Sequence, residues 1–180
     1  MPYLWMTFCF VCSIVTELSL GRCGLLVPTT TLCGFYFAVT FEGKRAALPL
    51  LAAFIAVDLG FGRPFPIHLL FLPGTLLLAY YWRHHGNLRN AWVQAVPGLV
   101  LGVQNAILEY LHSILRCVGK GDFWVPIQFS DWLMTIFFCL LLTPVLVFCG
   151  DFIASLLGIR KYTSAIRLAH VHALMEDSDG

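Results

Sequence analysis

Long apolar segments constrain this chain more than any other feature of its sequence. The apolar residues come in blocks of about 17 to 25, each long enough to cross the roughly 30 Å hydrocarbon core of a bilayer as an α-helix. The composition agrees, because 59% of the 180 residues are hydrophobic and 12% are charged, whereas a soluble domain carries roughly 25% charged residues. We therefore expect an all-α polytopic membrane protein.

Six of these segments are expected to span the membrane within one integral-membrane domain, residues 1–180. The expected spans are residues 3–20, 24–41, 46–60, 65–82, 91–115 and 132–157. The first lacks the basic leader and cleavage site of a secretory signal, so we expect it to be retained, with Glu17 at the interface near Arg22. Residues 158–180 are expected to form an amphipathic cytoplasmic tail that lies on the membrane surface.

The distribution of lysine and arginine predicts the orientation of these spans. Seven of these residues fall on the side of the N-terminus, the second and fourth loops and the tail, and four fall in the first, third and fifth loops. Cytoplasmic loops of membrane proteins carry the excess of positive charge. Both termini are therefore expected in the cytoplasm.

The stretch Ala46–Trp82 predicts two spans folded back on each other through a tight turn at Gly60–Pro66. Asp58 lies just before this turn and Arg63 lies inside it. A carboxylate at membrane depth is costly unless it is paired, solvated or used in function. Two interpretations stay open: a salt bridge that pins the hairpin, or a binding role. The Pro73–Gly74 pair predicts a kink in the second helix of the hairpin.

The fifth expected span is the longest and the most polar. Spacing of three and four residues puts Asn105, Glu109 and His112 on one helical face, which must face protein or water rather than lipid. Gly98 and Gly102 form a GxxxG pair that would let another helix approach closely. We favour helix packing over dimerisation for this pair.

The sequence lacks the common motifs that carry catalysis. It contains no GxSxG, no HExxH and no glycine-rich phosphate loop. The intramembrane carboxylates Asp58, Glu109 and Asp151 lie in three different spans without flanking motifs. Cys9 and Cys12 lie within a span and lack a second cysteine pair nearby. The residues indicate a non-enzyme without cofactor or metal, and no basic cluster is dense enough for nucleic acid.

Three stretches carry a family resemblance. Pro28 opens the second span after a short polar turn, Leu51–Asp58 precedes a short turn into Pro64–Leu70, and Leu141–Pro144 precedes the basic exit Phe152–Arg160. In these places, and in its length, six spans, cytoplasmic ends and minimal loops, the chain resembles the bacterial rod shape-determining protein MreD family. The resemblance covers nearly the whole chain and rests mostly on hydropathy.

The resemblance implies a non-enzymatic scaffold in the bacterial inner membrane. Such a protein belongs to the cell-elongation machinery, beside MreC, and helps couple cytoplasmic MreB filaments to peptidoglycan synthases. The implied fold resembles the bundle of substrate subunits of energy-coupling-factor transporters. In this role Gly98 and Gly102 would pack helices, and Asp58 with Arg63 would fix the hairpin.

A second function stays open, namely the vitamin-binding subunit of an energy-coupling-factor transporter. The polar stripe from Gln104 to His112 would then line a small-molecule pocket. Such a pocket gathers polar and aromatic groups from the outer half of several spans, and only the fifth span is clearly polar, which favours the scaffold. A proton-coupled carrier that uses Asp58 and Glu109 would be expected to show internal repeats, and none is seen.

Overall fold

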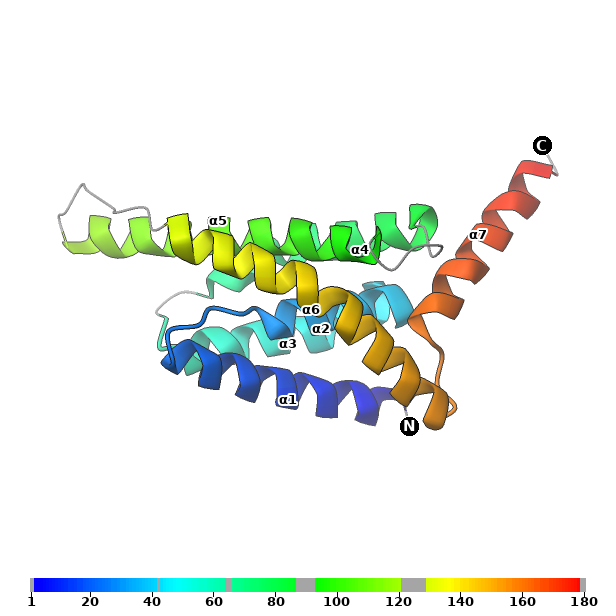
Figure 1. Cartoon of the computed structure of the whole chain (residues 1–180), viewed down its shortest axis with the longest axis horizontal. Helices are drawn as coiled ribbons and strands as arrows, with labels where there is room; N and C mark the ends of the chain where they lie inside the picture. The colour runs from blue at the N-terminus through cyan, green and yellow to red at the C-terminus, as the bar shows by residue number, and fades with distance from the viewer. Residues whose placement is uncertain (1, 42, 64–65, 87–92, 121–128, 179–180) are drawn as a thin grey trace.

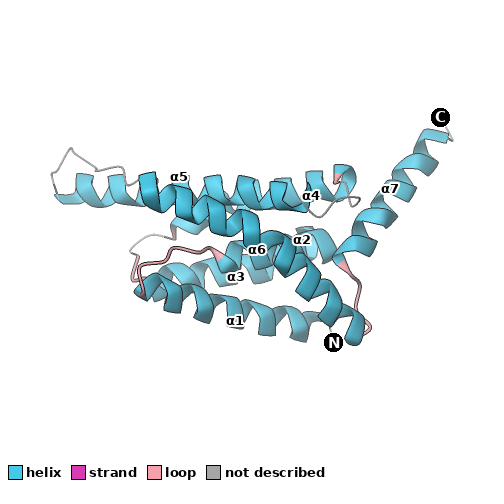
Figure 2. Cartoon of the chain, viewed as in Figure 1, coloured by secondary structure: helices cyan, strands magenta, loops and turns pink. Residues whose placement is uncertain are grey.

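The computed structural model describes residues 2–41, 43–63, 66–86, 93–120 and 129–178, and within them the chain is helical throughout apart from its turns (Figure 2). The α-helices are α1 Pro2–Arg22, α2 Thr29–Phe41, α3 Gly43–Gly60, α4 Leu72–His85, α5 Val96–Lys120, α6 Phe129–Leu156 and α7 Tyr162–Ser178. Two short 3₁₀ helices, η1 Ile67–Phe71 and η2 Val93–Ala95, precede α4 and α5. The expected all-α class is confirmed.

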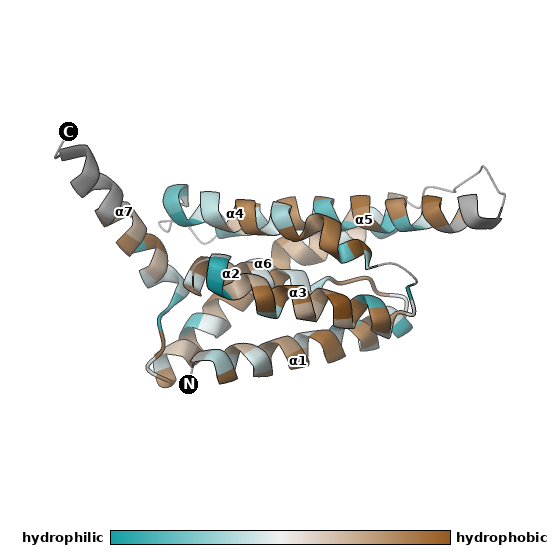
Figure 3. Ribbon diagram, turned by 180° about the vertical axis from the view of Figure 1, so that it is seen from behind, coloured by the Kyte–Doolittle hydropathy of each residue, from teal (hydrophilic) through white to brown (hydrophobic). Residues whose placement is uncertain are grey.

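Among the residues that the structure describes, three helices are long and apolar enough to cross a membrane, which fits a membrane protein. They comprise Tyr3–Arg22, Val93–Leu115 and Phe129–Leu156, while Thr29–Phe41 is a shorter apolar helix. The helices α1 to α6 run back and forth along the long axis of the molecule, and the N-terminus and α7 lie at the same end (Figure 1). Hydrophilic residues gather at this end, around the start of α3 and the C-terminus of α4 (Figure 3).

Helix α2 forms the centre of the bundle. It contacts α1, α3, α4, α5, α6 and α7, and each of its residues from Thr30 to Thr40 is buried. In a soluble protein a helix that is apolar on all sides is buried in the core. Here the neighbouring helices bury α2 in the same way. Because protein encloses α2, its 13 residues need not match the thickness of a bilayer.

The second expected span, residues 24–41, is helical only from Thr29 onward. The preceding turn is held by side chains, since Thr135 Oγ1 of α6 donates to the Leu26 carbonyl at 3.0 Å and Thr29 Oγ1 donates to the Ser13 carbonyl at 2.8 Å. Non-helical backbone is tolerated at membrane depth where protein satisfies its polar groups. Pro28 therefore ends the turn and precedes the helix.

The expected kink at Pro73–Gly74 is replaced by a helix start. Residues 67–71 form η1, and Pro73 lies in the first turn of α4, where a proline removes no helical hydrogen bond. The sequence predicted one span over residues 65–82 because η1 and the start of α4 are both apolar. Most of the loop expected between the fifth and sixth spans, residues 121–128, lies outside the described residues.

The tail differs from a helix that lies on the membrane surface. Tyr162, Ala165 and Ile166 in the first half of α7 are fully buried, and α7 contacts α2 and α4. The Tyr162 ring stacks on Tyr36 of α2, with ring centroids 5.7 Å apart, and burial raises the pKa of the Tyr162 hydroxyl. The first half of α7 thus belongs to the bundle, while the rest projects away from it (Figure 1).

Candidate functional site

A buried charged cluster lies where α3 ends and η1 begins, at the end of the bundle opposite the termini. Asp58 is 1% exposed, Arg63 8% and His68 4%. Arg63 Nη1 donates to Asp58 Oδ1 at 3.1 Å, and His68 donates to Asp58 twice, from its backbone N–H at 3.0 Å and from Nδ1 at 2.6 Å. We call Asp58, Arg63, His68 and Glu109 the Arg63 cluster.

Glu109 of α5 completes the Arg63 cluster. Its Oε1 accepts a hydrogen bond from Arg63 Nη2, and its side chain is 26% exposed. The guanidinium also lies over the Phe61 ring, 5.2 Å from the centroid, which is within the range of a cation–π contact. Arg63 thus bridges two carboxylates from helices far apart in sequence and joins the hairpin to α5.

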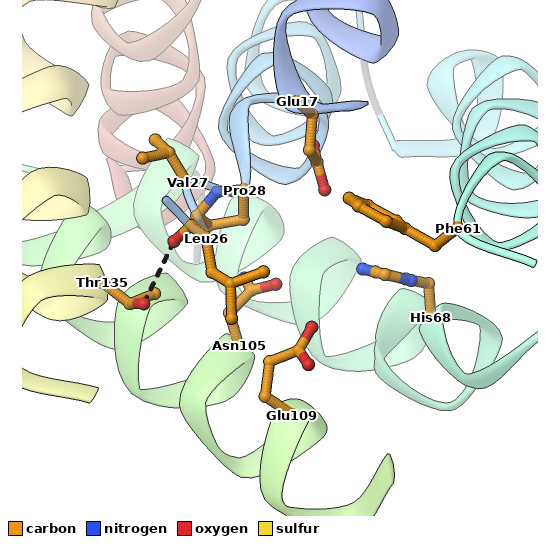
Figure 4. Close-up of a pocket in the computed structure, with 9 residues that line it drawn as sticks. All are labelled: Glu17, Leu26, Val27, Pro28, Phe61, His68, Asn105, Glu109 and Thr135. Carbon is orange, nitrogen blue, oxygen red and sulfur yellow. Dashed lines mark hydrogen bonds between the residues drawn. The ribbon is translucent and has the colours of Figure 1, made fainter. Parts of the chain in front are cut away.

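A cavity of about 20 Å³ adjoins the Arg63 cluster. Its lining comes from several helices and from the turn before α2, and comprises Glu17, Leu26, Val27, Pro28, Phe61, His68, Asn105, Glu109 and Thr135. The carboxylates of Glu17 and Glu109 and the ring of His68 converge on this space (Figure 4). A cavity of this size holds about one water molecule.

Glu17 corrects the expectation of an interfacial residue beside Arg22. It is 6% exposed and turns inward, where its Oε2 accepts the Thr30 backbone N–H at 2.8 Å. Thr30 lies in the first turn of α2, whose amides have no partner within the helix. A carboxylate is favoured at such a terminus by the helix dipole as well. Glu17 therefore caps α2.

Of the remaining predicted residues, one lines the cavity and two pack against a neighbouring helix. Asn105 is 7% exposed, lines the cavity and donates to the Leu101 carbonyl at 2.9 Å, while His112 is partly buried beyond the cavity lining. Gly98 and Gly102 pack on α6 instead. A Cβ on Gly102 would lie 2.8 Å from the Ile136 Cα, and one on Gly98 would collide with Thr143 and the Cys139 carbonyl.

The sequence indicated Asp58, Arg63 and Glu109 as candidate residues but did not predict that they contact one another. It did not indicate two further residues of the site. Glu17 and His68 are single ionisable residues in largely apolar runs, and only the fold brings them within reach of the other charged residues. The one signal for His68 was its place just after the turn that carries Arg63.

Another carboxylate, half-buried, lies at the other end of the bundle. Asp151 of α6 accepts the backbone N–H groups of Tyr162 at 2.6 Å and Thr163 at 3.1 Å, the Thr163 hydroxyl at 2.8 Å and the Tyr36 hydroxyl at 3.1 Å. Four donors satisfy both carboxylate oxygens. Asp151 therefore caps α7 and ties it to α2 and α6.

The arrangement offers hydrogen bonds and ion pairs rather than a set of metal ligands, since no group of three or more metal-ligating side chains occurs within the described ranges. Compared with known proteins, the chain matches no family model, no curated protein and no solved structure.

Proposed function

We propose that this chain is a non-enzymatic membrane scaffold, a helical platform on which other membrane proteins assemble. One observation carries the proposal: Arg63 and His68 satisfy Asp58, and Arg63 also binds Glu109. Charged groups that bind one another from three elements hold those elements in place. This use of a buried carboxylate matches the salt-bridged hairpin among the interpretations of Asp58.

The proposed topology is six spans with both termini in the cytoplasm. It is supported by the antiparallel course of α1 to α6 and by the position of the N-terminus and α7 at one end of the bundle (Figure 1). Lys44 and Arg45 at the start of α3 and Arg83 near the end of α4 lie toward that same end, as the positive-inside rule requires of the cytoplasmic side.

The proposed setting is the cell-elongation machinery of a bacterial inner membrane, as the resemblance to MreD implies. The partners would be MreC-like and wall-synthesis membrane proteins, with MreB filaments reached indirectly. The outer faces of α1 and α6 are apolar, with exposed Phe8, Val15, Phe148 and Phe152. Such faces suit lipid and the spans of partner proteins alike.

The vitamin-binding alternative has one observation in its favour, because the cavity beside the Arg63 cluster gathers polar groups from several helices. Its volume of about 20 Å³ counts against it, since small-molecule pockets measure about 300–1,000 Å³. A larger groove of about 430 Å³ lies between α6, η2 and the start of α7. That groove opens at the end expected to face the cytoplasm.

The experiment that tests the scaffold is purification of the full chain from its native membrane in mild detergent, with mass spectrometry of the proteins retained. MreC-like and wall-synthesis proteins should be recovered. Their retention should fall in Arg63→Gln, which opens the hairpin, and should persist in the matched Asp131→Asn at the exposed start of α6. Recovery of ABC-type ATPases or of a bound vitamin would overturn the proposal.

A further inference from the structure

The carboxylate of Glu17 is the buried charge that the Arg63 cluster leaves without a cation. Arg63 binds Asp58 and Glu109, and His68 binds Asp58, whereas Glu17 receives one backbone N–H on Oε2. Within the described residues Glu17 forms no ion pair. An isolated buried carboxylate costs several kcal/mol unless a proton or a partner neutralises it.

His68 lies across the same cavity and has one nitrogen to offer. Nδ1 lies 2.6 Å from Asp58 Oδ1, so this nitrogen carries the hydrogen, and Nε2 is left at the tip of the ring. In Figure 4 that tip and the Glu17 carboxylate face the same space. The volume of about 20 Å³ admits a single water molecule, and Asn105 offers a further polar contact in the lining.

We propose that Glu17 and His68 together bind one proton through a water molecule held in this cavity. When the proton rests on Glu17, the carboxyl donates to the water and the water donates to His68 Nε2. Transfer along these hydrogen bonds moves one proton to Nε2 and one from Glu17 to the water, which leaves a carboxylate and an imidazolium. Nδ1–H stays on Asp58 in both forms, so Asp58 orients the ring and stabilises its charge.

The other charged and titratable groups around the pair support this assignment. They are Asp58 of α3, Arg63 of the turn, Glu109 of α5 and Cys139 of α6. Arg63 pairs with both Asp58 and Glu109, and the Cys139 thiol is fully buried. Loss of the shared proton leaves an uncompensated negative charge between α1, α2 and η1. The site therefore makes the junction of these elements responsive to proton concentration.

The test uses infrared difference spectra of the full chain in phosphatidylcholine nanodiscs, recorded over a pH titration with side-chain 13C-labelled glutamate. Glutamate and histidine bands should change together in one step. In Glu17→Gln the part of the glutamate change that is coupled to histidine should be lost, while the signals of Glu42, Glu109 and Glu176 remain. In His68→Gln the midpoint of the Glu17 component should move. The matched Asp131→Asn should titrate like the wild type.

Three outcomes would overturn the proposal. Glutamate and histidine bands of the wild type could titrate independently, or the coupled step could vanish in Glu109→Gln while it persists in Glu17→Gln. The step could also shift between sodium and choline chloride, which would make the cavity a cation site. If Glu17→Gln does not fold, the labelled wild type is compared with His68→Gln instead. The proposal then fails if the midpoint of the glutamate change is the same in both.

Discussion

Replacement of Arg63 by glutamine is the sharpest test of the ion pairs that join the hairpin to α5. Removing one partner of a buried pair costs about 3–5 kcal/mol, because the other charge is left buried and uncompensated. The Asp58 side chain is 2% exposed, so this penalty applies to it without a discount for solvent. Asp58 keeps both hydrogen bonds from His68, which places the expected loss near the lower limit, about 3 kcal/mol.

Glu109 provides the matched comparison. Its side chain is 26% exposed, so water replaces part of what Arg63 supplies, and Glu109→Gln should cost about 1 kcal/mol or less. Asp58→Asn should cost about 3 kcal/mol. The double variant of Arg63→Gln and Asp58→Asn should lose about 1–3 kcal/mol less stability than the sum of the two single losses, because the two side chains are in direct contact.

The assay is reversible unfolding in mixed micelles with increasing dodecyl sulfate, followed by the fluorescence of the five tryptophans. The reasoning fails if Arg63→Gln unfolds within about 0.5 kcal/mol of the wild type, the ordinary range for a surface substitution. It also fails if Glu109→Gln costs as much as Asp58→Asn. Either result would mean that the buried pair does not hold the hairpin.

Two further substitutions test the packing of α5 and the cap of α7. Gly102→Ala places a methyl group against the backbone of α6 and should destabilise the fold by about 1–3 kcal/mol. The control is Gly74→Ala, whose added Cβ would lie 3.7 Å from its nearest atom, on Gln104, and which should be neutral or stabilising. Thermal melting in detergent measures both. Asp151→Asn should cost about 1–2 kcal/mol and speed hydrogen exchange in the first turn of α7, whereas exchange there as slow as in Asp131→Asn would contradict the cap.

The sequence predicted the helical class and the approximate position of each helix, because a bilayer requires long apolar segments. It did not predict which of them lies inside. In a lipid environment hydropathy does not separate a face toward protein from a face toward acyl chains. Thus α2, buried over Thr30–Thr40, and α6, with Phe148 and Phe152 exposed, are both apolar on all sides. Residue size is the remaining signal: the GxxxG pair predicted a close helix approach without naming the partner, and in the structure Gly98 and Gly102 lie against α6.

The polar residues obey a different rule, which joins the candidate site to the rest of the fold. Three times, a carboxylate near the end of one helix accepts an N–H at the start of the next helical element. The pairs are Glu17 with Thr30, Asp58 with His68, and Asp151 with Tyr162 and Thr163. In each case a glycine with positive φ ends the first helix, at Gly24, Gly62 and Gly158.

The same backbone hydrogen bond closes each of these helix ends, from the residue after the glycine to the carbonyl five positions earlier, as in a Schellman motif. The chain then turns, and the first amides of the next element need acceptors that a membrane interior does not supply. A carboxylate 10 to 13 residues upstream supplies one. On this view the acids are primarily caps that set helix order. Glu17 differs from Asp151 because it lines a cavity together with His68, and under the proposal above this cap also holds a proton.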